Sequence, residues 1–181
     1  SAYEAEVPMK YCYETEAYTI TIEGRADGVI TTSTGVVIDE IKGTYKDLDK
    51  LEAPQPVHLA QAMCYAFFYC EQKMLDAISV RMTYCNMETE EIRYFEEEYS
   101  REYITSWFGD LMSQYKKWAD FEIKWSEIRQ QSIKGLEFPF AYREGQKELI
   151  THVYHTICHR KKLFIEAPTG VGKTISTLFP S

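Results

Sequence analysis

The sequence has few features that would place the protein in a membrane or around a metal cluster. No apolar run approaches the roughly 20 residues that a membrane-spanning helix needs, and no secretory segment stands out. The five cysteines are an odd number and form no C-x-x-C pair, so they give little support to a zinc or iron–sulfur site. Scattered thiols fit a reducing compartment, so we expect a cytoplasmic protein with no membrane partner.

The sequence also lacks an overall positive charge. Its formal net charge is −8, so no general basic field attracts nucleic acid, and contact with DNA must depend on local patches or on metal ions. Hydrophobic residues make up 45% of the chain and aromatic residues 14%, which is typical of a folded protein. The 181 residues are enough for one ordinary domain and part of a second.

Two acidic residues and a lysine stand close together in a run rich in β-branched residues, 36–42, which predicts a strand. Because side chains alternate along a strand, Glu40 and Lys42 share one face and Asp39 points to the other. Lys42 could then reach a phosphate, or an attacking water, bound near Glu40.

A turn at residues 32–35 would place this strand beside the one before it, with Asp27 opposite Glu40. Like charges in that arrangement are destabilising, and a bound cation would compensate for them. Mg²⁺ accepts one or two carboxylates together with waters and phosphate oxygens. A solvated hairpin that carries an Asp, a Glu and a Lys would explain the same spacing, so periodicity alone leaves both interpretations open.

The surrounding sequence predicts a mainly antiparallel sheet with two helices. With the hairpin, the N-terminal strands would form a meander of about four strands. Besides the hairpin, we expect strands at residues 6–13, 18–23, 76–86 and 90–97. We expect helices at residues 58–72, opened by Pro54 and Pro56, and 101–133, capped by Ser100.

Other polar residues could join the site, although each has a plainer explanation. Gln61 and Tyr65 lie four residues apart on the first helix, so they could line the site together or simply touch the sheet. His58 is better explained as a polar residue at a helix start than as a ligand. The remaining acidic candidates, which a solvated strand edge would also explain, are Glu4, Glu6 and Glu14.

A second motif follows a short apolar strand expected at residues 163–167. It is Pro-Thr-Gly170-Val-Gly172-Lys173-Thr174, with the start of a helix behind it. This is the context of a P-loop, whose backbone N–H groups cradle phosphate while Lys173 contacts the β- and γ-phosphates and Thr174 binds Mg²⁺. No acidic Walker B strand follows, so we expect only the first part of a nucleotide-dependent motor here.

Three of these elements together resemble the RecB-like branch of the PD-(D/E)XK nucleases. That family has G-x-x-D on one strand, (D/E)-x-K on the next and Q-x-x-x-Y on the following helix. The matching residues are Gly24-Arg-Ala-Asp27, Glu40-Ile-Lys42 and Gln61-Ala-Met-Cys-Tyr65. The resemblance covers residues 1–134 and implies a mixed α/β, restriction-endonuclease-like core, in which helices flank a central sheet.

The resemblance also implies roles for these residues. Asp27, Glu40 and the carbonyl of Ile41 would hold Mg²⁺ or Mn²⁺. Lys42 would position or activate the attacking water, and Gln61 and Tyr65 would complete the catalytic set.

Residues 135–181 resemble the start of a DinG/XPD-type superfamily-two DNA helicase. The matching pieces are A-P-T-G-x-G-K-T, which ends at Thr174, and R-x-x-Q, whose Arg143 and Gln146 by resemblance contact adenine. ATP would be the cofactor of the complete motor. Some relatives carry an iron–sulfur cluster, which the cysteine spacing here does not support.

Together the two resemblances imply a metal-dependent deoxyribonuclease, expected to act as an exonuclease, within a nuclease–helicase of DNA repair or processing. The alternative is a catalytically inactive DNA-binding or regulatory module of an ATP-dependent helicase. DNA is the expected partner. An exposed edge on the C-terminal strand could also pair two copies into a homodimer.

Overall fold

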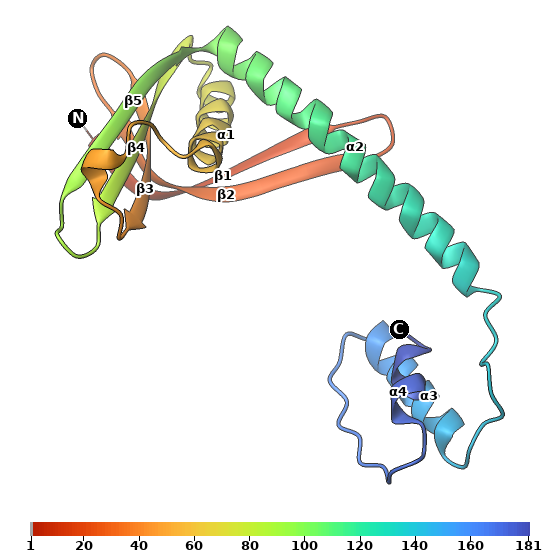
Figure 1. Cartoon of the computed structure of the whole chain (residues 1–181). Coiled ribbons are helices and arrows are strands. Elements are labelled where there is room, and N and C mark those ends of the chain that lie inside the picture. Colours follow the sequence, from red (N-terminus) through yellow and green to blue (C-terminus); the bar gives the residue numbers. More distant parts are fainter. Residues whose placement is uncertain (1) are drawn as a thin grey trace. The chain divides into compact units, whose positions relative to one another are not determined.

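A computed structural model describes residues 2–181 (Figure 1). The chain divides into two compact units, the first ending at Asp120 and the second beginning at Phe121. This division lies inside helix α2 (Arg101–Ile133), whereas the expected boundary between residues 134 and 135 follows the end of that helix and stays a prediction. Within the described residues, no helix is both long and apolar enough to cross a membrane.

One mixed five-stranded sheet organises the first unit. Its strands lie side by side in chain order: β1 (Ala2–Glu14), β2 (Thr19–Thr31), β3 (Val36–Thr44), β4 (Ala77–Asn86) and β5 (Ile92–Ser100). Only β3 and β4 pair in parallel, and the other neighbours are antiparallel. A parallel pair needs a crossover, which helix α1 (Pro56–Lys73) provides (Figure 1). The mixed α/β class and the mainly antiparallel sheet are therefore confirmed.

The expected four-stranded N-terminal meander is wrong in one respect. Residues 18–23 and the first arm of the hairpin form one continuous strand, β2, so the meander has three strands. Gly24 lies within this strand. A Cβ atom at Gly24 would come within 2.5 Å of the Tyr65 hydroxyl, so its missing side chain leaves room for the helix.

The hairpin register is as predicted. Gly28 pairs with Asp39 and Thr31 with Val36, and the turn closes with a 2.9 Å bond from the Thr32 N–H to the Gly35 carbonyl. The ladder between β2 and β3 ends at Gly28 and Asp39. Asp27 and Glu40 therefore lie immediately beyond the last regular pair.

Helices α1 and α2 supply the apolar layer that covers one face of the sheet. Phe67 of α1 stacks on Phe108 of α2 at 4.1 Å between ring centroids, and Tyr11 of β1 packs edge-on against both rings. The expected cap of α2 is present, because the Tyr103 N–H donates to Ser100 Oγ at 3.2 Å. Further along α2, Tyr115 is 52% exposed, and the buried residues of the helix, Ile104, Phe108 and Met112, lie before it.

The second unit contains the rest of α2, helix α3 (Gln146–Cys158) and the short helix α4 (Lys173–Leu178). Its buried residues include Gln146, Val153 and Ser176. The strand expected at residues 163–167 does not form, and Phe164 is 94% exposed. No second strand lies in this unit to complete a ladder, so the apolar run stays unpaired. A homodimer through this segment remains a prediction, but the exposed strand edge on which we based it is not present in the structure.

Candidate functional site

Asp27 lies at a point in β2 where the regular alternation of side chains between the two faces of the sheet is interrupted. Ala26 and Val29 both belong to the buried core, although simple alternation would place them on opposite faces. Beside this point on β1, Glu6 has a left-handed backbone with φ of 56°, although the register of the two strands is the same on both sides of it. The regular pairing of β1 with β2 skips Glu6 and Asp27. This irregularity lets Asp27 join the face that carries Glu40.

The Asp27 carboxylate takes the place of a backbone acceptor at the end of the ladder. Its Oδ2 accepts a 2.7 Å hydrogen bond from the N–H of Ile41, the residue between Glu40 and Lys42. The side chain is thus fixed against the β3 backbone at the position that the sequence predicts for a metal ligand.

Glu40 is buried, with only 1% of its surface exposed, but its hydrogen bonding is incomplete. Oε1 accepts from Lys42 Nζ at 2.7 Å, whereas Oε2 is buried without a partner. Burial raises the pKa of the Glu40 carboxyl and the nearby Asp27 charge raises it further, while Lys42 acts in the opposite direction. A buried carboxylate oxygen without a donor is costly unless something binds to it.

Lys42 connects Glu40 to helix α1. Its Nζ also donates to Gln61 Oε1 at 3.1 Å, and Gln61 Nε2 lies 3.4 Å from the Tyr65 hydroxyl. Since that hydroxyl lies against Gly24, all three sequence motifs meet on one face of the sheet. We call this group, formed by Asp27, Glu40, Lys42, Gln61 and Tyr65, the carboxylate–lysine cluster.

The donor set of this cluster fits a divalent cation. Oε2 of Glu40 is an unused acceptor, and Asp27 brings a second carboxylate beside it. Within residues 2–181, no group of three or more His, Cys, Asp or Glu side chains is placed to hold a metal. An ion here would therefore have two carboxylates as protein ligands, with water or substrate oxygens in its other positions, and the family resemblance adds the Ile41 carbonyl.

Asp39, next to Glu40 in the chain, lies on the opposite face of β3. Its two oxygens accept from Arg81 at 2.8 Å and from Thr83 at 2.5 Å. The sequence-based assignment of Asp39 away from the site agrees with these contacts.

The other acidic candidates and His58 do not join the carboxylate–lysine cluster. Glu6 pairs with Arg25 at 3.1 Å, Glu14 accepts from Thr19 at 2.7 Å, and Glu4 is exposed opposite Val29. The Nδ1 atom of His58 lies 3.1 Å from the hydroxyl of Tyr84.

In the second unit, the expected adenine-contacting residues reach the P-loop. The Arg143 guanidinium donates to the Gly170 carbonyl, and a Cβ atom at Gly172 would lie 2.6 Å from Gln146 Nε2. Both loop glycines have left-handed backbones, with φ of 87° and 83°. Lys173 Nζ donates to the carbonyls of Ala167 and Pro168 at 2.8 Å each.

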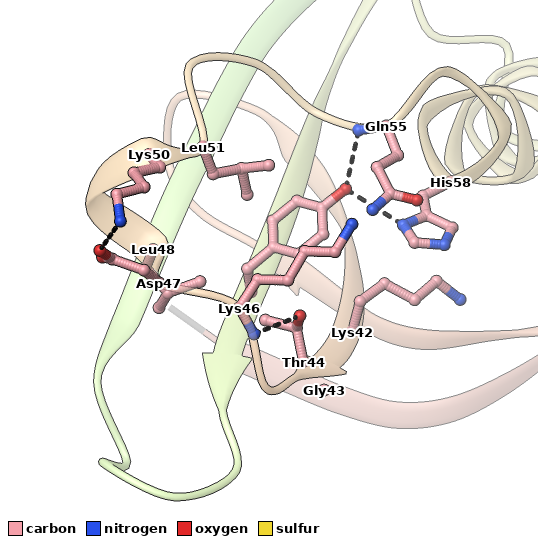
Figure 2. A pocket seen from close by; sticks show the side chains of 11 residues that line it. Lys42, Gly43, Thr44, Lys46, Asp47, Leu48, Lys50, Leu51, Gln55 and His58 are labelled. Atoms are coloured by element: carbon pink, nitrogen blue, oxygen red, sulfur yellow. Dashed lines mark hydrogen bonds and ion pairs between the residues drawn. The ribbon is translucent and has the colours of Figure 1, made fainter.

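Sequence reasoning missed a cavity beside Lys42. It has a volume of about 490 Å³ and lies between the segment after β3 and the start of α1 (Figure 2). Lys42, Lys46 and Lys50 all line it, and their spacing of four residues is visible in the sequence. A single 3-10 turn (Leu48–Lys50) shapes the wall.

Comparisons with known proteins reach only parts of the chain. No protein-family model matches the sequence. In structure, 62% of the chain resembles half of the protein described as "Crystal structure of SSO0001", with 21% identity and a TM-score of 0.43, too low to support an assignment. A 46-residue segment is 44% identical to "Probable ATP-dependent helicase MJ0942" of Methanocaldococcus jannaschii, and the matched part is only 7% of that protein. A quarter of the chain is therefore similar to a small part of an ATP-dependent helicase.

Proposed function

We propose that the first unit is a metal-dependent deoxyribonuclease with a PD-(D/E)XK core. The observation that carries this proposal is the buried Glu40, whose one oxygen is bonded to Lys42 and whose other oxygen has no partner. A buried oxygen without a donor is costly and, unlike Arg81 Nε, which is also buried without a partner, it can bind a cation. A site that binds a cation and a phosphodiester requires such an oxygen.

Each residue has a role that follows from its contacts. Asp27, Glu40 and the Ile41 carbonyl would hold Mg²⁺ or Mn²⁺, which when bound supplies positive charge to the phosphorus oxygens and acidifies a water. Asp27 is kept in place by its bond to the Ile41 N–H.

Lys42 is the residue that we propose positions or activates the attacking water. Glu40 and Gln61 hold its ammonium from two sides, so it is oriented before substrate arrives. The ammonium can position the water and stabilise negative charge on the phosphate. Gln61 and Tyr65 orient Lys42 and the DNA strand rather than taking part in bond making.

We also propose that the C-terminal segment begins the motor of an ATP-dependent DNA helicase, joined to the nuclease in a longer DNA repair or processing protein. Two observations support this proposal. One is the local similarity to the helicase from Methanocaldococcus jannaschii, and the other is the contact of Arg143 and Gln146 with the loop glycines. Processing by a motor fits cleavage from DNA ends, so an exonuclease is the proposed mode.

Cleavage of end-labelled single- and double-stranded DNA with Mn²⁺ tests the nuclease proposal. We expect Asp27→Ala and Lys42→Ala each to lower the rate by about 10²–10⁴-fold, which is typical of a lost catalytic group. Lys10→Ala is the matched control, because Lys10 is exposed on β1 and pairs with Glu23. Unchanged cleavage in both site variants would overturn the proposal. A wild-type chain that binds DNA but neither cuts it nor binds Mn²⁺ would instead indicate a non-catalytic module.

A further inference from the structure

A basic cavity adjoins the carboxylate–lysine cluster and shares Lys42 with it. We call it the lysine cavity, formed by the segment after β3, the first turn of α1 and Tyr84 of β4. Three lysines line it, although the chain as a whole carries a net charge of −8. Lys42 and Lys50 pair with Glu40 and Asp47, so Lys46 supplies the available positive charge beside the proposed cleavage site.

Asp47 is the one acidic residue among those that line the cavity, and it pairs with Lys50 and not with Lys46. Asp47 forms an ion pair with Lys50 at 3.1 Å and accepts a hydrogen bond from the Asp49 N–H. Figure 2 shows the Lys46 side chain extending across the cavity toward Gln55 and His58. Lys46 therefore presents its ammonium to the cavity and not to the acidic residue.

The start of α1 adds the positive end of a helix dipole to the same wall, although Pro56 lacks an N–H and the His58 and Leu59 N–H groups donate to the Gln55 carbonyl. This 18-residue helix has Pro56 in its first turn, no acidic residue there and no side-chain cap from Gln55. Its uncapped N-terminus thus favours an anion. The Gln55 N–H is already used, because it donates to the Tyr84 hydroxyl at 3.0 Å.

His58 offers one further donor. Burial and the nearby Lys42 lower the pKa of His58, so its ring is neutral at pH 7. The Tyr84 hydroxyl accepts from Gln55, so its own hydrogen can be donated to His58 Nδ1 at 3.1 Å. In this assignment Nε2 carries the ring hydrogen and can donate to a ligand.

The opposite part of the lining is apolar. Leu48 is buried, Leu51 is half-buried, and both line the cavity together with Tyr84. Such a wall suits the sugar and base of a nucleotide better than a free inorganic anion. The volume of about 490 Å³ falls within the roughly 300–1,000 Å³ of small-molecule sites.

We propose that the lysine cavity binds one nucleotide of the DNA strand next to the cleaved bond. Lys46 and the start of α1 hold its phosphate, and Leu48 and Leu51 contact its sugar or base. The inference rests on the proposed nuclease function, because Lys42 links the cavity to the cleavage site. The cavity would then fix the register of the strand against the carboxylate–lysine cluster.

Binding in EDTA separates this inference from cleavage. With metal-free protein, we expect thymidine monophosphate to bind more tightly than inorganic phosphate or thymidine alone. Lys46→Ala should weaken that binding about tenfold, which corresponds to one lost hydrogen bond to a charged group. The slope of the logarithm of oligothymidylate affinity against the logarithm of salt concentration should also fall by about one, as expected for the loss of one phosphate contact. Lys10→Ala again serves as the control, since its lysine lies outside the cavity lining.

A second variant tests the apolar wall. Leu51→Trp should fill the cavity and weaken binding of thymidine monophosphate, while thermal unfolding reports whether the fold is kept. Phosphate that binds as tightly as the nucleotide would overturn the nucleotide assignment, and so would Lys46→Ala and Leu51→Trp proteins that bind thymidine monophosphate like wild type. If Asp27→Ala leaves cleavage unchanged but Lys46→Ala weakens nucleotide binding, the nuclease proposal fails while the binding site stands.

Discussion

Asp39 and Glu40 are neighbours on β3 and both are buried, yet their surroundings differ completely. Each oxygen of Asp39 has a donor, one from Arg81 and one from Thr83. Glu40 has a donor for one oxygen only, and burial raises its pKa. A carboxylate with both oxygens bonded stabilises the fold, whereas one left half-satisfied weakens the fold and is suited to a ligand. The two faces of one strand therefore carry different carboxylates, one fully paired and one with an unsatisfied oxygen.

The largest effect that we expect is on cleavage, from the conservative pair Glu40→Gln and Asp39→Asn. Glu40→Gln keeps the shape of the side chain but removes the negative charge that would hold the cation, so the rate with Mn²⁺ should fall at least about 100-fold. Asp39→Asn keeps its position on the other face and should retain most of the activity.

Rates for both variants should be measured on the same end-labelled DNA, with circular dichroism to confirm that each is folded. Equal losses of activity in the two variants would contradict the division of roles between the two faces.

The next effect is on stability, for which a change at Asp39 should matter more than a change at Glu40. Asp39→Ala removes the partner of a guanidinium that is only 25% exposed and should lower the free energy of unfolding by about 2 kcal/mol. Glu40→Gln removes a buried charge and should change it by less than about 1 kcal/mol. Urea unfolding of both variants checks this comparison. A larger loss for Glu40→Gln would mean that Glu40 is the structural residue.

Local rules were enough to predict the faces of β3 and the register of the hairpin. Side-chain alternation and a four-residue turn involve only near neighbours, so spacing was enough to place Asp27 opposite Glu40 and to put Lys42 on the same face of the strand as Glu40. The contact of Lys42 with Gln61 depended on the family pattern, because nothing in the strand itself indicates where the following helix packs.

Features that depend on distant segments were not predicted. The parallel pairing of β3 with β4 and the loss of the strand at residues 163–167 depend on which partner strands are present. The change of face at Asp27 depends on Glu6, which lies on another strand and has no sequence signal for a left-handed backbone. Lys46 was missed because a charged loop is usually solvated, and only the fold shows that it lines a cavity.

A smaller effect on cleavage tests whether Tyr65, which lies farther from Glu40 on α1, belongs to the proposed site. At Gly24, an added Cβ atom would lie 2.5 Å from the Tyr65 hydroxyl, so Gly24→Ala must displace the ring and disturb its contact with Gln61. We expect cleavage to fall about tenfold, which is typical when a supporting residue is lost. Gly35→Ala is the matched control, because a Cβ atom there meets nothing within 4 Å. Equal cleavage rates for the two alanine variants would indicate that Tyr65 does not contribute to the site.

The smallest effect is a pH dependence, measured in EDTA so that no cation binds. Because burial raises the pKa of Glu40 above its ordinary value of 4.5, the folded protein holds this proton more tightly than the unfolded chain does. The stability that this proton contributes is fully present below pH 4.5 and is lost as the pH rises through the raised pKa. Glutamine does not ionise, so Glu40→Gln should gain stability relative to wild type as the pH rises from 4 to 8. Thermal unfolding across that range follows the difference between the two proteins. A difference that shrinks toward high pH would mean that Lys42 outweighs burial, and Glu40 would then be a stabilising ion-pair residue like Asp39.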